Sequence, residues 1–181
     1  MSAAAAYPIE LAGHLKLPNK RRLWIRPLRR CEGAVVRNLY DHLSPRTRYL
    51  RFFSSMPALP DSVVRLLTCV DYRRRLALVA ELETPAGAEV VALGSFAAID
   101  EHRAEVGLVV RDEWQRQGVG VALAERVLAA AEARGFDRFV AHTLWDNAVL
   151  RRLLRHVGDI ISSTTRHGVS ELTFSSRSRS G

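Results

Sequence analysis

The stretch EVGLVV, residues 105–110, followed after a short polar turn by QRQGVG, residues 115–120, decides the fold. The first run is typical of a buried strand, and a long amphipathic segment follows the second. Together they predict a strand, a glycine loop and a helix. A helix that begins at such a loop leaves several backbone N–H groups unpaired near the positive end of its dipole. The stretch therefore predicts an anion site, with phosphate as the expected ligand.

The spacing of the glycines limits which class of phosphate-containing ligand the loop could bind. One residue separates Gly118 from Gly120, and the loop lacks both the Gly-Lys-Ser/Thr ending of a triphosphate loop and the third glycine of a dinucleotide fingerprint. From these six residues alone, an ordinary tight turn before a helix stays an open alternative.

Composition limits the class of protein. With 181 residues, 48% of them apolar, the chain can form one core, and we expect a single domain with flexible ends at 1–6 and 175–181. No apolar run approaches the ~20 residues that cross a bilayer, and residues 1–6 are too short for a secretion signal, which predicts a cytoplasmic protein. Cys31 and Cys69 have neither metal-ligand nor disulfide spacing, so we expect semi-buried thiols and no metal.

The net charge of +8 is compatible with nucleic acid, an acidic protein or a polyanionic cofactor as partner. The arginines form small scattered groups instead of one recognition helix, which favours solvated surface and makes nucleic acid the weakest choice.

Periodicity and turn residues predict the other elements. We expect an α+β protein with strands at 9–17, 22–26, 76–83, 90–99, 105–110, 138–143, 160–165 and 168–174, and helices at 32–43, 45–53, 61–67, 119–134 and 147–156. Asp61 is the predicted N-cap of one helix, either Asn147 or Asp146 is that of another, and Gly135 is a predicted C-cap.

The loop at 115–120 resembles the pyrophosphate loop of the GCN5-related N-acetyltransferases (GNAT). The segments Tyr7-Pro8, IRPLR at 25–29 and LSPRTRYLRFF at 43–53 resemble the acetyltransferase domain of the bacterial Pat-type protein lysine acetyltransferases. This resemblance covers residues 7–174. It implies the GNAT fold, a mixed, mostly antiparallel central sheet flanked by helices, with acetyl-CoA as co-substrate.

The resemblance also implies a set of cofactor-binding residues. The pantetheine arm would lie beside the strand that ends at Leu108, Val109 and Val110, and backbone N–H groups would hold the pyrophosphate at Arg116, Gln117, Gly118, Val119, Gly120 and Val121. Asn147 would contact pantetheine or a water, besides capping its helix. The Arg116 side chain would either pair with phosphate or be solvated.

Acetyl transfer to an amine needs a base, because a lysine ammonium has a pKa of ~10.4. Glu105 is our candidate: it aligns with the glutamate base of the Pat-type enzymes, and partial burial beside an apolar strand would raise its pKa. The alternative is a surface glutamate paired with an arginine such as Arg103. Glu101 and His102 are fallback bases. A backbone N–H near Val109 would stabilise the oxyanion.

A dedicated general acid is not evident. The tyrosine that many GNAT enzymes place seven residues after the asparagine is Leu154 here, and Asp159 replaces an aromatic residue after Gly158. A thiol has a pKa of ~8.5, so water could protonate the departing CoA. His142 and Trp145 would line the mouth of the site or pack, and we favour packing.

The sequence therefore predicts an acetyl-CoA-dependent N-acetyltransferase that works by direct attack in a ternary complex. An acidic cleft would favour polyamines or aminoglycosides as acceptors, whereas the basic segment 46–51 favours an acidic protein surface and hence a protein lysine. A small-molecule amine acceptor and a non-catalytic CoA-binding regulatory module are the alternatives. The sequence does not determine the acyl chain length or whether the protein is a monomer or homodimer.

Overall fold

The computed structural model describes residues 5–54 and 56–177, whose strands form one sheet in the order β1-β2-β3-β4-β5-β6-β8-β7. Every neighbouring pair is antiparallel except β5 and β6, which are parallel. The predicted class, a mixed and mostly antiparallel α+β sheet, is confirmed. The strands are β1 (Gly13–Lys16), β2 (Arg22–Pro27), β3 (Arg75–Thr84), β4 (Gly87–Ala98), β5 (Arg103–Val110), β6 (Arg138–Leu144), β7 (Gly158–Arg166) and β8 (Val169–Ser176).

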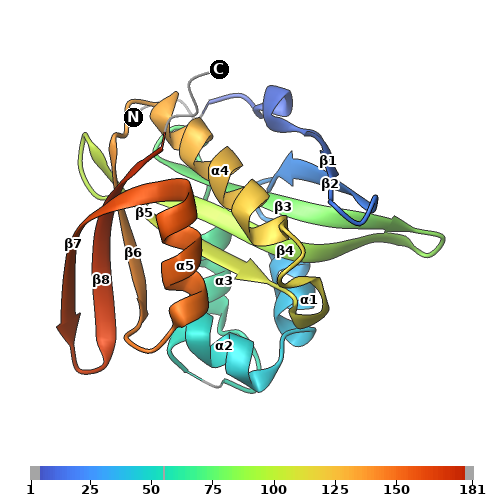
Figure 1. Cartoon of the computed structure of the whole chain (residues 1–181). Coiled ribbons are helices and arrows are strands. Elements are labelled where there is room, and N and C mark those ends of the chain that lie inside the picture. Colours follow the sequence, from blue (N-terminus) through green and yellow to red (C-terminus); the bar gives the residue numbers. More distant parts are fainter. Residues whose placement is uncertain (1–4, 55, 178–181) are drawn as a thin grey trace.

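Helices cover both faces of the sheet (Figure 1). A Cβ at Gly94 of β4 would meet Leu123 and Val127 of α4, whereas the next residue along, Leu93, faces side chains of α1, α2 and α3. The α4 helix, with α5 packed beside it, therefore lies on one face, and α1–α3 lie on the other. The helices are α1 (Gly33–Asp41), α2 (Pro45–Phe52), α3 (Asp61–Thr68), α4 (Val119–Glu132) and α5 (Ala148–Val157), with 3-10 turns η1 (Ile9–Leu11) and η2 (Asp112–Trp114).

The predicted strand at 9–17 is wrong in its first half. Residues Ile9–Leu11 form the 3-10 turn η1, in which the Leu11 N–H donates to Pro8 O at 3.1 Å, and strand β1 begins at Gly13. The side chain of Ile9 is 65% exposed. The alternation of apolar and polar residues at 9–12 therefore does not mark a sheet face.

Two predicted helix caps also differ. Pro60 stands at the N-cap of α3, and Asp61 is the first helical residue, with its carboxylate paired to Arg37 of α1. The α4 helix ends at Glu132, and Gly135 follows two residues beyond its C-cap with φ +94°. Asn147, in contrast, caps α5 as predicted, because its Oδ1 accepts the Leu150 N–H at 3.1 Å.

The last strand is longer at its C-terminal end than the predicted strand 168–174. Strand β8 continues to Ser176, and the Arg177 N–H donates to Val157 O at 2.9 Å. Residues 1–4 and 178–181, which make up most of the tails predicted to be flexible, lie outside the described residues. Cys31 and Cys69 are both exposed, not semi-buried. In the described chain, no helix has the length and apolar character to span a bilayer.

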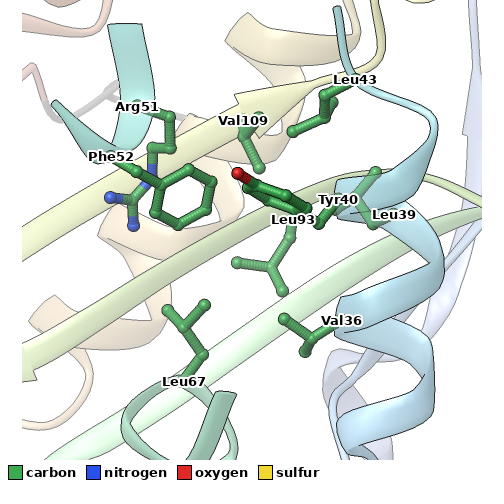
Figure 2. Close-up of a pocket in the computed structure, with 9 residues that line it drawn as sticks. All are labelled: Val36, Leu39, Tyr40, Leu43, Arg51, Phe52, Leu67, Leu93 and Val109. Carbon is green, nitrogen blue, oxygen red and sulfur yellow. The ribbon is translucent and has the colours of Figure 1, made fainter. Parts of the chain in front are cut away.

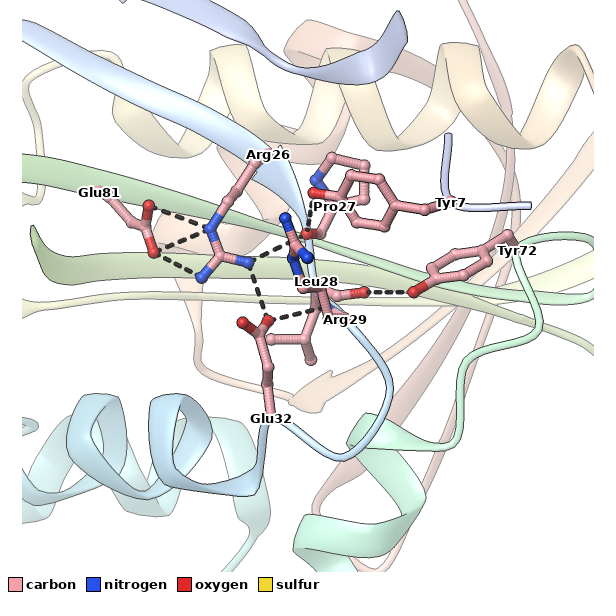
Figure 3. Close-up of polar contacts among 8 residues, drawn as sticks. All are labelled: Tyr7, Arg26, Pro27, Leu28, Arg29, Glu32, Tyr72 and Glu81. Atoms are coloured by element: carbon pink, nitrogen blue, oxygen red, sulfur yellow. Dashed lines mark hydrogen bonds and ion pairs between the residues drawn. The ribbon is translucent and has the colours of Figure 1, made fainter. Parts of the chain in front are cut away.

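A polar network at the end of β2 fixes the start of α1 against the sheet (Figure 3). Arg26 donates to both carboxylate oxygens of Glu81, which is 7% exposed, and to Glu32 at 2.8 Å. Burial opposes the charge of Arg26, but the two carboxylates raise its pKa above the ordinary value. The Tyr7 hydroxyl donates to Pro27 O at 3.0 Å. Two of the segments that carry the Pat-type resemblance, Tyr7-Pro8 and 25–29, are thus joined in space.

Candidate active site

The sheet opens between its two parallel strands. β5 and β6 pair over only three residues each, from Arg103–Arg138 to Glu105–Val140. Beyond Glu105 the strands diverge (Figure 1). Because β4 and β8 occupy their outer edges, the inner edges of β5 and β6 carry backbone groups with no strand to bind.

Successive residues of β5 direct their backbone N–H groups to opposite edges of the strand, which identifies the groups that face the opening. The Arg111 N–H donates to Val91 O of β4, so the odd-numbered residues of β5, including Val109, direct their N–H groups to β4. Leu108 and Val110 consequently direct theirs into the opening. The predicted oxyanion donor near Val109 thus cannot be the N–H of Val109 itself.

The facing edge belongs to β6. The Trp145 N–H donates to the O of Gly168, the residue just before β8, so odd-numbered residues of β6 bond to β8. His142 and Leu144 therefore direct backbone groups toward β5. An extended chain placed in the opening would find hydrogen-bonding partners on both sides.

The glycine loop lies at the wide end of this opening. The α4 helix begins at Val119 after Gly118, which has φ +87° and caps the helix without a side-chain hydrogen bond. A Cβ at Gly120 would lie 3.5 Å from Leu108 and 3.6 Å from Val110, so the first turn of α4 packs directly on the end of β5. The backbone N–H groups of this first turn of α4 are free to bind an anion.

Side chains hold the loop in this shape. Gln117 accepts from Asn19 at 3.0 Å and donates to Glu113 O at 2.6 Å. Arg116, also at positive φ (57°), is exposed, and its side chain has no hydrogen bond or ion pair with another described residue.

Asp112 joins the loop to α2, a link the sequence analysis missed. Its carboxylate accepts the Ser44 N–H at 2.9 Å and the hydroxyls of Ser44 and Thr47, each at 2.7 Å. Burial alone would raise the pKa of Asp112, but these hydrogen bonds outweigh it and lower the pKa. Gln115 extends the link by donating to Thr47 Oγ1 at 3.3 Å and to Val110 O at 3.0 Å.

Glu105 stands at the narrow end of the opening. Its side chain is 54% exposed, so the predicted partial burial is wrong. The alternative partner Arg103 instead pairs with Asp100 at 2.6 Å. Glu101, a fallback base, pairs with Arg74 in the exposed β4–β5 turn, where His102 also lies.

His142 lies between two carboxylates. Its Nδ1 is 3.4 Å from Glu105 Oε1, and its Nε2 is 3.3 Å from Glu171 Oε2. The three side chains project from β5, β6 and β8 on the α1–α3 face, so His142 belongs to the site instead of packing in the core. Trp145, also expected to pack, is 64% exposed. In the part of the chain that the structure describes, no cluster of three metal-ligating side chains suits a metal ion.

Arg51 of α2 covers Gly107, midway between Glu105 and Val109. A Cβ at Gly107 would overlap the guanidinium, lying 3.0 Å from its Cζ. Figure 2 shows Arg51 beside Phe52, at the margin of a small apolar pocket lined by residues of α1, α3, β4 and β5. Burial lowers the pKa of Arg51, and the nearby Glu105 opposes that shift.

The other arginines of the predicted basic segment 46–51 do not face the site. Arg48 stacks on Tyr40, with its Cζ 4.4 Å from the ring centroid, and donates to backbone carbonyls of α1. Arg46 is exposed on the first turn of α2. The expected basic acceptor surface therefore reduces to Arg51.

The position of the missing tyrosine offers no proton donor. Leu154 is 3% exposed within the core, and Asp159 pairs with Arg177 at 2.6 Å.

Comparisons with known proteins agree with this architecture. The Acetyltransferase (GNAT) family matches residues 36–158. The crystal structure of the GNAT domain of S. lividans PAT superposes with a TM-score of 0.82 at 27% identity, over 94% of this chain and 99% of that domain. Acetyltransferase PA5475 of Pseudomonas aeruginosa is 26% identical over 143 residues, 78% of this chain and 77% of the relative.

A third neighbour shares the fold alone. The structure of yncA, a putative acetyltransferase from Salmonella typhimurium with its cofactor acetyl-CoA, has a TM-score of 0.66 at 16% identity and covers 88% of this chain and 96% of that one. The family match covers more than half of the sequence. The chain belongs to the acetyltransferase (GNAT) family and is an acyl-CoA N-acyltransferase. The predicted resemblance to Pat-type domains is also confirmed.

Proposed function

We propose that the protein transfers the acetyl group of acetyl-CoA to a protein lysine by direct attack in a ternary complex. One observation carries the proposal: a single opening between β5 and β6 has an anion-binding helix end at one side and Glu105 at the other. The similarity to the S. lividans PAT domain supports a protein acceptor, and the Salmonella structure supports acetyl-CoA as donor.

The cofactor would lie along the opening. The pyrophosphate would bind the N–H groups of Arg116 to Val121, and the pantetheine amides would bond to Leu108 and Val110 on one side and to His142 and Leu144 on the other. From Glu105 to Val110, β5 rises about 17 Å. An extended pantetheine arm spans a similar length, which would place the thioester near Glu105.

Glu105 would act as the base. It would accept a proton from the lysine ammonium, either directly or through water, and the freed amine nitrogen would attack the thioester carbon. His142 would hold the Glu105 carboxylate, and Glu171 would hold His142 from the far side. Collapse of the tetrahedral intermediate would break the C–S bond, and water would protonate the CoA thiolate, since the chain offers no tyrosine at Leu154.

A small cationic amine is the second candidate acceptor. The carboxylates of Glu105 and Glu171, both more than half exposed at the mouth of the site, would attract such a cation. Of the arginines in segment 46–51, only Arg51 lies close enough to oppose that attraction. The lysine acceptor, the cytoplasmic location and the absence of a metal stay predictions.

Incubation with radiolabelled acetyl-CoA distinguishes these functions. The protein is mixed either with a bacterial lysate or with a panel of free lysine, spermidine and an aminoglycoside, and Glu105→Gln supplies the background of non-enzymatic labelling. Label above that background on proteins alone supports the proposal. Label on small amines alone supports the second candidate, and no label with either would indicate a non-catalytic CoA-binding module.

A further inference from the structure

Arg51 is a half-buried cation that contacts the Phe52 ring but has no hydrogen-bonding partner among the described residues. Its Nε is enclosed and makes no hydrogen bond, and within the described residues its guanidinium forms neither a hydrogen bond nor an ion pair. A guanidinium stays charged and has five N–H donors. Burying such a group unpaired is unfavourable, so a position of this kind indicates a partner that arrives with a ligand.

The location of Arg51 identifies which part of the ligand that partner is. Gly107 shares a face of β5 with Glu105 and Val109, and lies about 7 Å along the strand from each. Because Gly107 has no side chain, the guanidinium reaches the backbone beside the opening. A thioester carbon attacked by an amine that has lost its proton to Glu105 must lie close to this point.

The backbone N–H groups of Leu108 and Val110 face the opening, but those of the residues on the same face as Gly107 do not. The N–H of Val109, like those of the other odd-numbered residues of β5, is directed to β4. We propose that Arg51 donates hydrogen bonds to the carbonyl oxygen of the bound thioester and stabilises the oxyanion that forms there, an inference that rests on the function proposed above.

Acetyl transfer would proceed by addition of the amine and elimination of CoA. The neutral amine nitrogen forms a bond to the carbonyl carbon, and the π electrons of the C=O bond move to oxygen, where Arg51 stabilises the negative charge. The nitrogen loses its remaining excess proton to solvent, the C=O bond re-forms, and the C–S bond electrons leave with CoA as a thiolate. Arg51 is neither protonated nor deprotonated.

The surroundings strengthen the interaction. Phe52, with its ring centroid 5.2 Å from the Arg51 Cζ, and the apolar side chains of Tyr40, Leu93 and Val109 exclude water from one side of the guanidinium. A charge–oxyanion interaction is stronger in such an environment than in water.

The test compares Arg51→Gln with the parent in two measurements. We expect kcat to fall about 10²- to 10³-fold, the usual effect of removing an oxyanion donor. We also expect acetyl-CoA to bind about tenfold more weakly while free CoA, which lacks the carbonyl, binds with unchanged affinity. Arg46→Gln removes the same charge from the exposed first turn of α2 and should change neither quantity.

Gly107→Ala keeps the arginine but displaces its guanidinium, so it should reproduce both effects even if Arg51→Gln folds poorly. The proposal is overturned if either variant keeps the parental kcat and the parental ratio of acetyl-CoA to CoA affinity, or if Arg51→Gln is faster than the parent, because the guanidinium would then obstruct the site. If the parent transfers acetyl to no amine, the proposed function fails, while the binding comparison still tests the contact between Arg51 and the carbonyl.

Discussion

Replacing Gly118 by alanine tests whether the loop before α4 is the phosphate site. A Cβ at this position would meet only Pro18 Cδ at 3.8 Å, so space is available and the cost comes from φ +87°. A left-handed conformation costs a non-glycine residue ~1–2 kcal/mol, and the reduced freedom of the unfolded chain returns ~0.4–1 kcal/mol. We expect a net loss of about 1 kcal/mol and a fall in Tm of about 2–4 °C.

Gly135 is a matched control at the other end of α4. It has φ +94° with no atom within 4 Å of the added Cβ, so Gly135→Ala should lose a similar amount of stability. The two variants differ in what the strained backbone carries. At Gly118, a change of backbone conformation that relieves the strain would turn the N–H groups of the first turn of α4 away from the opening, whereas at Gly135 it would not. Loss of one hydrogen bond to a charged group costs ~1.5–3 kcal/mol, which weakens acetyl-CoA binding by about 10- to 100-fold.

Thermal unfolding followed by circular dichroism and calorimetric titration with acetyl-CoA measure the two effects on the same preparations. Equal losses of stability with weaker binding only for Gly118→Ala would support the assignment. If Gly118→Ala loses stability but binds acetyl-CoA with parental affinity, the pyrophosphate does not lie on this loop.

Two further predictions concern the charged groups that hold the scaffold. Arg26→Met leaves Glu81 buried without its cation and should lower the free energy of unfolding by ~3–5 kcal/mol in chemical denaturation; a loss below ~1 kcal/mol would show that the network contributes little. Asp112 has a lowered pKa in the folded protein, so its bonds to Ser44 and Thr47 stabilise fully above the unfolded pKa of ~3.9 and are lost as pH falls through the lower folded value. Urea unfolding should therefore show the parent more stable than Asp112→Asn at pH 6 and the gap narrowing toward pH 3, whereas a constant gap would exclude this linkage.

Local patterns predicted the parts of the site that depend on neighbouring residues. The strand, the glycine loop and α4 follow one another within 30 residues, and Asn147 caps α5 through an N–H only three residues away. The same kind of pattern failed at Ile9–Leu11, where alternation imitates a strand but hydrogen bonds within the segment close a 3-10 turn.

Contacts between distant strands and helices were not predictable in this way. His142 meets Glu171 because β6 and β8 pair in a register that places them opposite each other. Arg51 reaches Gly107 only because α2 packs across β5. Asp112 joins the loop to α2 across more than 60 residues of sequence. Each of these depends on tertiary packing, for which a single sequence contains no local signal.

The role of Glu105 is tested most directly by measuring acetyl transfer by Glu105→Gln at saturating acetyl-CoA. As a matched control, Glu101→Gln makes the same change in the exposed β4–β5 turn, outside the opening. We expect Glu105→Gln to lower kcat by about 10²- to 10⁴-fold, the usual contribution of a general base, with the Kd for acetyl-CoA unchanged and Glu101→Gln fully active. If Glu105→Gln transfers acetyl groups as fast as the parent, Glu105 is not the base.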